Sequence, residues 1–238
     1  MIGFYNYTVI LTYMAVMSAV VGITQLFKGR LLWAIVCLML AGCCDMFDGK
    51  VASMCKRTKE EKEFGIQIDS LSDVIAFGVL PACIGAALFR RSEMLNRLCT
   101  TADGKSSFLY IFLHAVLVLY ILAALIRLAY FNVTEEMRQE VEGDKARSEY
   151  TGLPVTSAAL ILPVVMIIDF LCRSVDLGLI YFAVIILMSL AFLLKFKIRK
   201  LGLKGVLFLI GIGVIEGLLL VLCLLSVKRI IFSPFTRW

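Results

Sequence analysis

The sequence predicts an all-α protein: a polytopic bundle of about six to eight transmembrane helices. Of the 238 residues, 61% are hydrophobic and 18% are charged, with a mean hydropathy of +0.94. The apolar residues come in runs of about 20, the length that a helix needs to cross about 30 Å of hydrocarbon. The 24 Lys and Arg gather between these runs. The net charge of +6 therefore suits anionic lipid headgroups better than nucleic acid, which we do not expect as a partner.

Seven apolar windows are long enough to form spans. They are residues 8–27, 31–53, 66–89, 108–131, 153–172, 176–195 and 205–226. The first window follows seven residues without Lys or Arg and is too long for a signal-peptide core, so we expect a retained span. No internal repeat or long polar domain separates the windows. We therefore expect one membrane-embedded domain over residues 1–238.

The second and third windows carry aspartates near the charged segment 56–63 that joins them. We expect these two windows to form a helical hairpin with its polar ends together. Asp45 and Asp48 are three residues apart and Asp69 and Asp73 are four apart, so each pair shares one helix face. Four unpaired aspartates in a membrane would together cost about 10 kcal/mol or more. Arg127 is the only basic residue well inside a span, so a bound cation must offset the acids.

Small residues accompany the acids on the same two helices. Gly49 and Ala52 continue the stripe of the second window, and Gly65 precedes Asp69 by one turn. Carboxylate oxygens suit Mg²⁺ or Mn²⁺, and two such ions would screen a substrate diphosphate while one carboxylate accepts a proton. Alternatively, the acids could pair with basic residues to fix helix packing or line an ion path. Four acids at these spacings, with three small residues, favour the metal and phosphate site.

The spacing Asp45-x-x-Asp48-Gly49-x-x-Ala52, followed by Gly65-x-x-x-Asp69-x-x-x-Asp73, resembles the signature of the CDP-alcohol phosphotransferases. The segments RLAYFN at 127–132 and YTGLPVTSAA at 150–159 resemble the phosphatidylserine synthase branch. This resemblance implies a CDP-diacylglycerol--serine O-phosphatidyltransferase. Such an enzyme transfers the phosphatidyl group of CDP-diacylglycerol to the hydroxyl of L-serine by direct displacement, releases CMP and forms a membrane homodimer.

The resemblance also implies roles for individual residues. The four positions that match metal ligands are Asp45, Asp48, Asp69 and Asp73. Asp73 also matches the base proposed for the acceptor hydroxyl. The positions that match the lining of the cytidine diphosphate site are Gly49, Ala52 and Gly65.

The chain departs from the family pattern in two ways. Ser53 stands where the family has arginine, and the spacer from Ser53 to Gly65 is longer than usual. The missing arginine could contact a substrate phosphate. Lys50, Lys56 and Arg57 are therefore candidates to replace it, and the sequence does not choose among them.

The acceptor site is expected around Arg127 and Asn132. Arg127 could hold a lipid phosphate or the serine carboxylate, or extend to the membrane interface. Asn132 and the turn Gly152-Leu153-Pro154 resemble branch-specific residues of an acceptor pocket, although a helix-start turn explains them equally well. Two other functions stay open. The acceptor could be glycerol phosphate or an inositol phosphate, or the acids could line a path for divalent cations.

The charge distribution predicts the orientation weakly. Thirteen of the 24 Lys and Arg fall in the segments 50–64, 132–152 and 195–204, which would share one side of the membrane. The positive-inside rule then favours a hairpin that faces the cytoplasm, although four basic residues in 90–105 argue against it. We expect a location in a bacterial cell membrane with the active site facing the cytoplasm.

Overall fold

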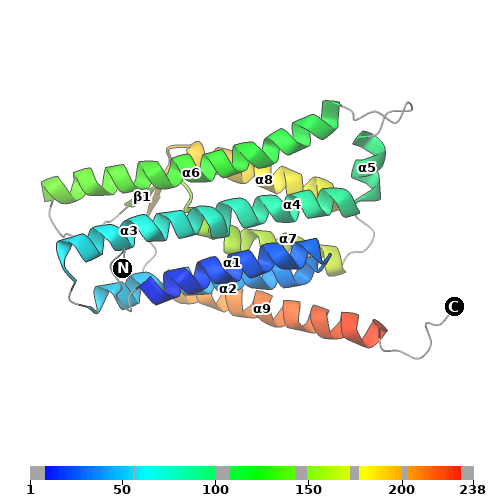
Figure 1. Cartoon of the computed structure of the whole chain (residues 1–238), viewed down its shortest axis with the longest axis horizontal. Helices are drawn as coiled ribbons and strands as arrows, with labels where there is room; N and C mark the ends of the chain where they lie inside the picture. Colours follow the sequence, from blue (N-terminus) through cyan, green and yellow to red (C-terminus); the bar gives the residue numbers. More distant parts are fainter. Residues whose placement is uncertain are drawn as a thin grey trace.

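The computed structural model describes residues 9–55, 57–99, 108–142, 149–171, 177–199 and 203–231. Helices dominate this part of the chain and run alongside one another (Figure 1). They are α1 (Ile10–Phe27), α2 (Leu31–Ser53), α3 (Lys59–Asp73), α4 (Leu80–Arg91), α5 (Glu93–Cys99), α6 (Phe108–Glu142), α7 (Ala158–Leu171), α8 (Leu177–Leu193) and α9 (Leu203–Ile231). Two three-residue strands, β1 (Glu149–Thr151) and β2 (Lys197–Arg199), pair antiparallel. The predicted all-α class is confirmed.

Within the described residues, five helical segments are long and apolar enough to cross a membrane. They are Ile10–Phe27, Leu31–Gly49, Lys59–Arg91, Phe108–Arg138 and Phe208–Leu225. The fifth and sixth predicted windows contain shorter apolar helices, Val155–Ile168 and Gly178–Leu193. The chain is therefore a polytopic membrane protein, as its hydropathy predicted. The fourth window differs in length, because α6 continues past residue 131 to Glu142.

The third window forms part of one continuous helical rod, Lys59–Arg91, in which α3 and α4 are joined by a π-helical segment, Val74–Val79. Pro81 lies just after this segment and lacks the N–H that would bond to the carbonyl of Phe77, four residues earlier. The hydroxyl of Tyr120 on α6 donates a hydrogen bond to that carbonyl at 2.8 Å. Tyr120 therefore satisfies a buried backbone group that the proline leaves without a helical partner.

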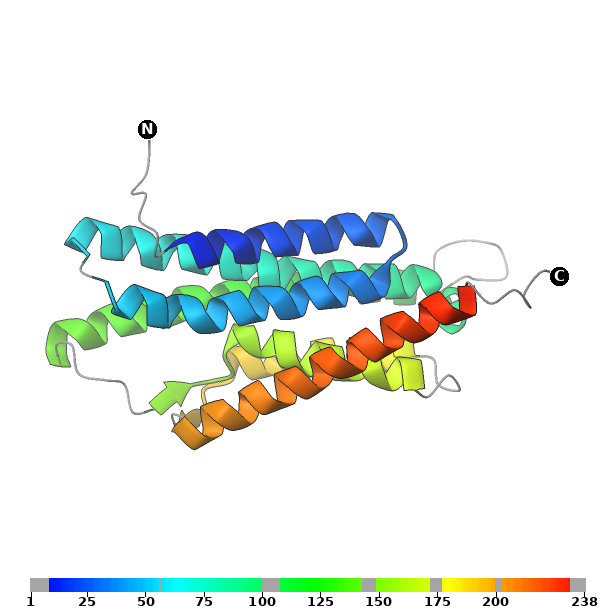
Figure 2. The ribbon, with the colours of Figure 1, turned by 90° about the horizontal axis from the view of Figure 1, so that it is seen from below.

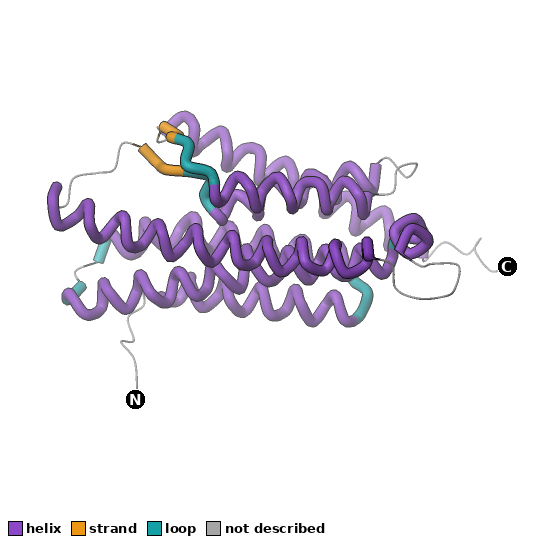
Figure 3. Tube along the Cα trace, turned by 90° about the horizontal axis from the view of Figure 1, so that it is seen from above, coloured by secondary structure: helices purple, strands orange, loops and turns teal. Residues whose placement is uncertain are grey.

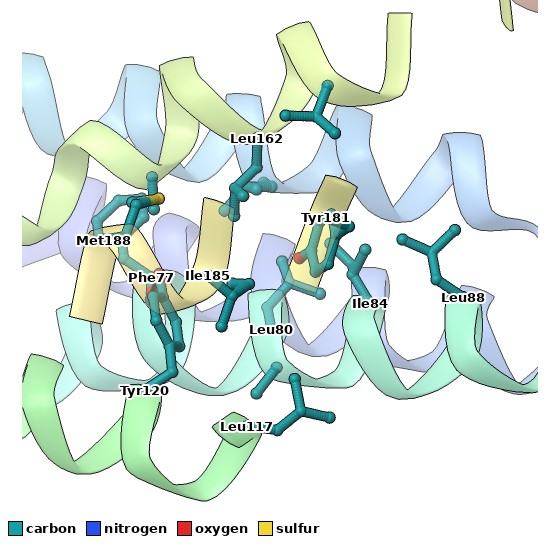
Figure 4. Close-up of a cluster of buried hydrophobic side chains, with 14 of the residues drawn as sticks. Phe77, Leu80, Ile84, Leu88, Leu117, Tyr120, Leu162, Tyr181, Ile185 and Met188 are labelled. Carbon is teal, nitrogen blue, oxygen red and sulfur yellow. Dashed lines mark hydrogen bonds between the residues drawn. The ribbon is translucent and has the colours of Figure 1, made fainter. Parts of the chain in front are cut away.

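The core lies where this rod packs between α6 and α8. Figure 4 shows its centre, with Phe77, Leu80 and Ile84 of the rod, Leu117 and Tyr120 of α6, and Tyr181 and Ile185 of α8. The hydroxyl of Tyr181 donates to the carbonyl of Pro81 at 2.7 Å, so its polar end is satisfied within the core. Gly42 allows α2 to approach α7 closely, because a Cβ there would lie 2.5 Å from the Cβ of Ala159.

One end of the bundle collects the polar parts of the fold. The C-terminal ends of α2 and α6 lie there with the N-terminal end of α3, and the β1–β2 ribbon lies beside them (Figures 1, 2 and 3). α3 begins with a capping box, in which the side chain of Thr58 accepts from the backbone N–H of Glu61 and the side chain of Glu61 accepts from that of Thr58. The capping box satisfies backbone N–H groups at the start of α3 and so fixes where this helix begins.

Candidate active site at the acidic end of the bundle

The acidic cluster is formed by the hairpin that the sequence predicts. One carboxylate oxygen from each of Asp45, Asp48 and Asp69 lies within 4.8 Å of the others. Asp45 and Asp48 share a face of α2 because they are one turn apart, and Asp69 faces them from α3. Asp48 is buried, and the other two are half-buried. Three hard oxygen donors at this separation could hold a divalent cation.

Asp73 lies one turn further along α3 and is 8% exposed. Its carboxyl group interacts with that of Asp45, whereas the carboxyl group of Asp69 interacts with that of Asp48. The four acids therefore meet as two pairs across the hairpin. Three of them are close enough to share one ion, and Asp73 lies at the edge of this group.

Helix α1 supports the cluster through a residue that sequence reasoning missed. Thr12 is 4% exposed, and its hydroxyl donates to Asp48 Oδ2 at 3.3 Å. The hydroxyl of Ser72 donates to the carbonyl of Thr12 at 3.2 Å. Thr12 thus contacts both acidic helices. A hydroxyl residue within an apolar window was the only signal that could have drawn attention to it.

A cavity of about 700 Å³ opens beside Asp69 and Asp73. This volume lies within the range of small-molecule sites. Its walls come from α3, the C-terminal part of α6 and the turn that precedes α7. Arg127 and Asn132, both predicted from the sequence, line it. Six further charged side chains also line it, namely Lys59, Lys62, Glu63, Glu135, Glu136 and Glu140. These were missed because no local pattern shows that the start of α3 and the end of α6 face each other across a cavity.

Arg127 and Asn132 are held by hydrogen bonds at the cavity wall. Arg127 is 6% exposed, so it is buried here rather than extended to the membrane interface. Its Nε donates to the carbonyl of Leu153 at 3.1 Å, and its guanidinium group lies 5.7 Å from the ring centroid of Phe131. The amide nitrogen of Asn132 donates to the hydroxyl of Ser70 at 2.7 Å and so joins α6 to α3.

Gly49 and Gly65 of the motif lie on the same hairpin but are not among the described residues that line this cavity. A Cβ added to Gly49 would meet nothing within 4 Å, so there is open space beside it. A Cβ on Gly65 would lie 3.5 Å from Nη1 of Arg57. The side chains of Lys50, Ala52 and Ser53 lie outside the described residues, as does Lys56.

Among the three candidates for the missing family arginine, Arg57 is the one whose side chain the structure describes. Arg57 immediately precedes Thr58, the N-cap of α3. Its guanidinium group lies beside Gly65 in the second turn of that helix. Gly65 is one turn before Asp69. A guanidinium group therefore lies beside Gly65 of the motif even though position 53 holds serine.

Comparison with known proteins agrees with the sequence motif. The family model of the CDP-alcohol phosphatidyltransferases matches residues 5–232. The chain is 29% identical over 137 residues to the CDP-diacylglycerol--serine O-phosphatidyltransferase of Helicobacter pylori (strain ATCC 700392 / 26695), a match that covers 58% of this chain and 46% of that protein. It is 32% identical over 126 residues to the enzyme of the same name from Saccharomyces cerevisiae (strain ATCC 204508 / S288c), covering 52% of this chain and 38% of that protein. The matched region therefore spans less than half the length of either relative.

Proposed function

Because this chain belongs to the CDP-alcohol phosphatidyltransferase family, we propose that it is a phosphatidylserine synthase. It would transfer the phosphatidyl group of CDP-diacylglycerol to the hydroxyl of L-serine and release CMP. The observation that carries this proposal is the meeting of four aspartates from α2 and α3 beside a cavity with charges of both signs. The names of the Helicobacter and yeast relatives support the choice of serine.

The acidic side chains have separate tasks in this reaction. Two ions of Mg²⁺ or Mn²⁺, held by Asp45, Asp48, Asp69 and Asp73, would neutralise the diphosphate and the charge that develops on the leaving phosphate. Asp73 borders the cavity and accepts the proton of the serine hydroxyl. The hydroxyl oxygen bonds to the phosphorus of the phosphatidyl group while the phosphoanhydride bond to CMP breaks. The displacement is direct, without a covalent enzyme intermediate.

The charges of the cavity favour a zwitterionic acceptor. Its lining contains three basic side chains, Lys59, Lys62 and Arg127, which can attract a carboxylate. It also contains six acidic ones, Glu63, Asp69, Asp73, Glu135, Glu136 and Glu140. Glu135 pairs with Arg138, whereas Glu136 and Glu140, also on α6, can attract an ammonium group. Glycerol phosphate and inositol phosphate carry only negative charge, so they offer no cationic group to these carboxylates. Serine carries both charges and fits this lining better.

An acceptor panel tests the proposal. The purified protein is incubated with CDP-diacylglycerol and Mn²⁺ or Mg²⁺, together with serine, glycerol 3-phosphate or an inositol phosphate. We expect phosphatidylserine and CMP with serine alone, identified by mass spectrometry. A lipid product formed only from a phosphorylated acceptor would replace serine in the proposal. A divalent-cation conduit would instead give ion flux in liposomes and no CMP with any acceptor.

Arg57 is expected to bind the cytidine diphosphate part of the donor. Arg57→Gln should raise the KM for CDP-diacylglycerol by about tenfold, the effect of losing one charge-assisted hydrogen bond of about 1.5 kcal/mol. The KM for serine should stay within a factor of about two, because neither Arg57 nor the neighbouring Gly65 is among the residues that line the proposed acceptor cavity. Initial rates of CMP release measure both constants. The matched control is Arg91→Gln, because Arg91 is an exposed arginine at the far end of the Lys59–Arg91 rod. If both substitutions raised the KM for CDP-diacylglycerol equally, this role of Arg57 would be contradicted.

We also propose the assembly and orientation that the family resemblance and the charge pattern support. The chain would form one membrane-embedded domain over residues 1–238 and pair as a homodimer in a bacterial cell membrane. Thirteen of its 24 Lys and Arg belong to segments 50–64, 132–152 and 195–204. The described parts of these segments lie at the acidic end of the bundle, which supports an active site that faces the cytoplasm.

A further inference from the structure

The turn that follows β1 has an unusual backbone and tight neighbours. Gly152 has a φ of +76°, and among the described residues only Gly29, with a φ of +69°, shares such a value. Residues with a side chain rarely adopt this conformation. The N–H of Gly152 donates to the carbonyl of Phe196 at 2.6 Å, beside the pair that Thr151 of β1 forms with Lys197 of β2. The ribbon therefore holds this turn against the segment that follows α8 (Figure 3).

Gly152 is wedged between α8 and Arg127. A Cβ at this position would lie 3.0 Å from the carbonyl oxygen of Leu194 and 3.4 Å from Nε of Arg127. The N–H of Leu153 donates to the carbonyl of Ala191, at 3.4 Å, on α8. The neighbouring atom of Leu194 is a backbone carbonyl oxygen. It therefore cannot move away from a Cβ at position 152 unless the end of α8 shifts with it. Only glycine fits between these two neighbours without displacement.

The same turn fixes the guanidinium group of Arg127. The carbonyl of Leu153 accepts the hydrogen bond from Arg127 Nε, and the ring of Phe131 lies beside the group. Because a guanidinium group is planar, holding Nε sets the plane and so the direction of its other N–H groups. Arg127 shares the cavity wall with Asp69 and Asp73. The direction of its donors thus depends on where residues 152 and 153 lie.

We propose that Gly152 is a positioning residue that acts through Arg127. The β1–β2 ribbon and the Gly152 turn hold the guanidinium group in one orientation, in which it binds an anionic oxygen group of a substrate. That group is either the carboxylate of serine or a phosphate of CDP-diacylglycerol, and planar bidentate binding suits both. This inference rests on the proposed function, and it adds a residue that touches no substrate.

The structure supplies a matched control for the test. Gly29 lies in the turn between α1 and α2, has nearly the same φ, and a Cβ there would meet nothing within 4 Å. Gly29→Ala therefore introduces the same backbone strain without the contact. We expect Gly152→Ala to raise the KM of one of the two substrates by about 10- to 100-fold, the size of effect that a misplacement of about 1 Å produces. Gly29→Ala should leave both KM values unchanged.

A second variant separates the close contact from the backbone conformation. Asparagine tolerates a positive φ better than alanine but still adds a Cβ. Gly152→Asn is therefore expected to fold more readily than Gly152→Ala and to show the same rise in KM. If Gly152→Asn had the wild-type KM, the positive φ of residue 152, and not the close contact of a Cβ with Arg127, would determine the KM. That result would overturn the proposal.

A double-mutant cycle then tests whether Gly152 acts through Arg127. Arg127→Gln should raise the KM of the same substrate, and adding Gly152→Ala to it should change that KM little further. Multiplicative effects of the two substitutions would overturn the proposal, as would a wild-type KM in Gly152→Ala. The substrate whose KM rises identifies the bound group as carboxylate or phosphate. The wild-type protein is assayed in parallel, so its failure to release CMP would reject the proposed function itself.

Discussion

Asp73→Asn is expected to lower kcat for CMP release by about 10²- to 10⁴-fold, the usual contribution of a positioned general base. The amide has nearly the size of the carboxyl group but cannot accept the proton of the acceptor hydroxyl. Asp73 lies at the edge of the acidic group, and Asp45, Asp48 and Asp69 stay together without it. The KM for CDP-diacylglycerol should therefore change much less than kcat. Quantifying CMP by chromatography during serine-dependent turnover measures both constants.

The same chemical change can be made at a buried carboxyl group elsewhere in the protein. Glu216 on α9 is 4% exposed, and among the described residues neither of its carboxylate oxygens has a hydrogen-bond partner. It does not line the cavity. Glu216→Gln should therefore retain wild-type kcat. If Asp73→Asn were as active as Glu216→Gln, another group would have to remove the proton.

Removal of divalent ions is expected to abolish CMP release, and added Mg²⁺ or Mn²⁺ should restore it. Four carboxyl groups meet at the acidic end of the bundle, and an unpaired aspartate inside a membrane costs about 2.5 to 3.5 kcal/mol. Cations that neutralise these groups should also stabilise the fold. At a metal concentration of about 100 times Kd, the free energy of unfolding should rise by about 2.7 kcal/mol per site.

Two measurements follow the ion independently of turnover. Titration calorimetry with Mn²⁺ in the presence of CDP-diacylglycerol should show heat of binding that Asp48→Asn reduces and Glu216→Gln does not. Thermal unfolding in detergent should show a higher Tm with metal for the wild type. Full activity in chelator, together with an unchanged Tm and no heat, would contradict the metal role of the aspartates.

The order of the helices and the acidic hairpin could be predicted from the sequence because both depend on local patterns. Apolar windows bounded by charge correspond to α1, α2, the Lys59–Arg91 rod, α6 and α9. The spacing of Asp45, Asp48, Asp69 and Asp73 places each pair on one helix face. A short loop between consecutive spans then brings the two faces together. The metal-ligand hypothesis needed no further information.

Arg127 and Asn132 were predicted to share a site, but the rest of the cavity beside the acids could not be predicted in the same way. The mixed-charge stretch after residue 131 was compatible with a helical extension or a loop, and the structure shows a helix as far as Glu142. Hydropathy does not show that this extension lies beside α3, because tertiary contacts hold it there. The link from Thr12 to Asp48 spans 36 residues, and that from Asn132 to Ser70 spans 62. A sequence pattern says which residues share a helix face, but not which face a distant helix presents to it.

The sequence by itself determined the class of this protein, the order of its apolar helices and the faces that carry its four aspartates, since hydropathy and helical spacing act within one segment. Only the tertiary structure decided which charged groups face the acids, how Tyr120 satisfies the carbonyl left open by Pro81, and why Gly152 borders Arg127. These features arise from close packing between helices that are distant in the chain. Such contacts exist only once the bundle has formed.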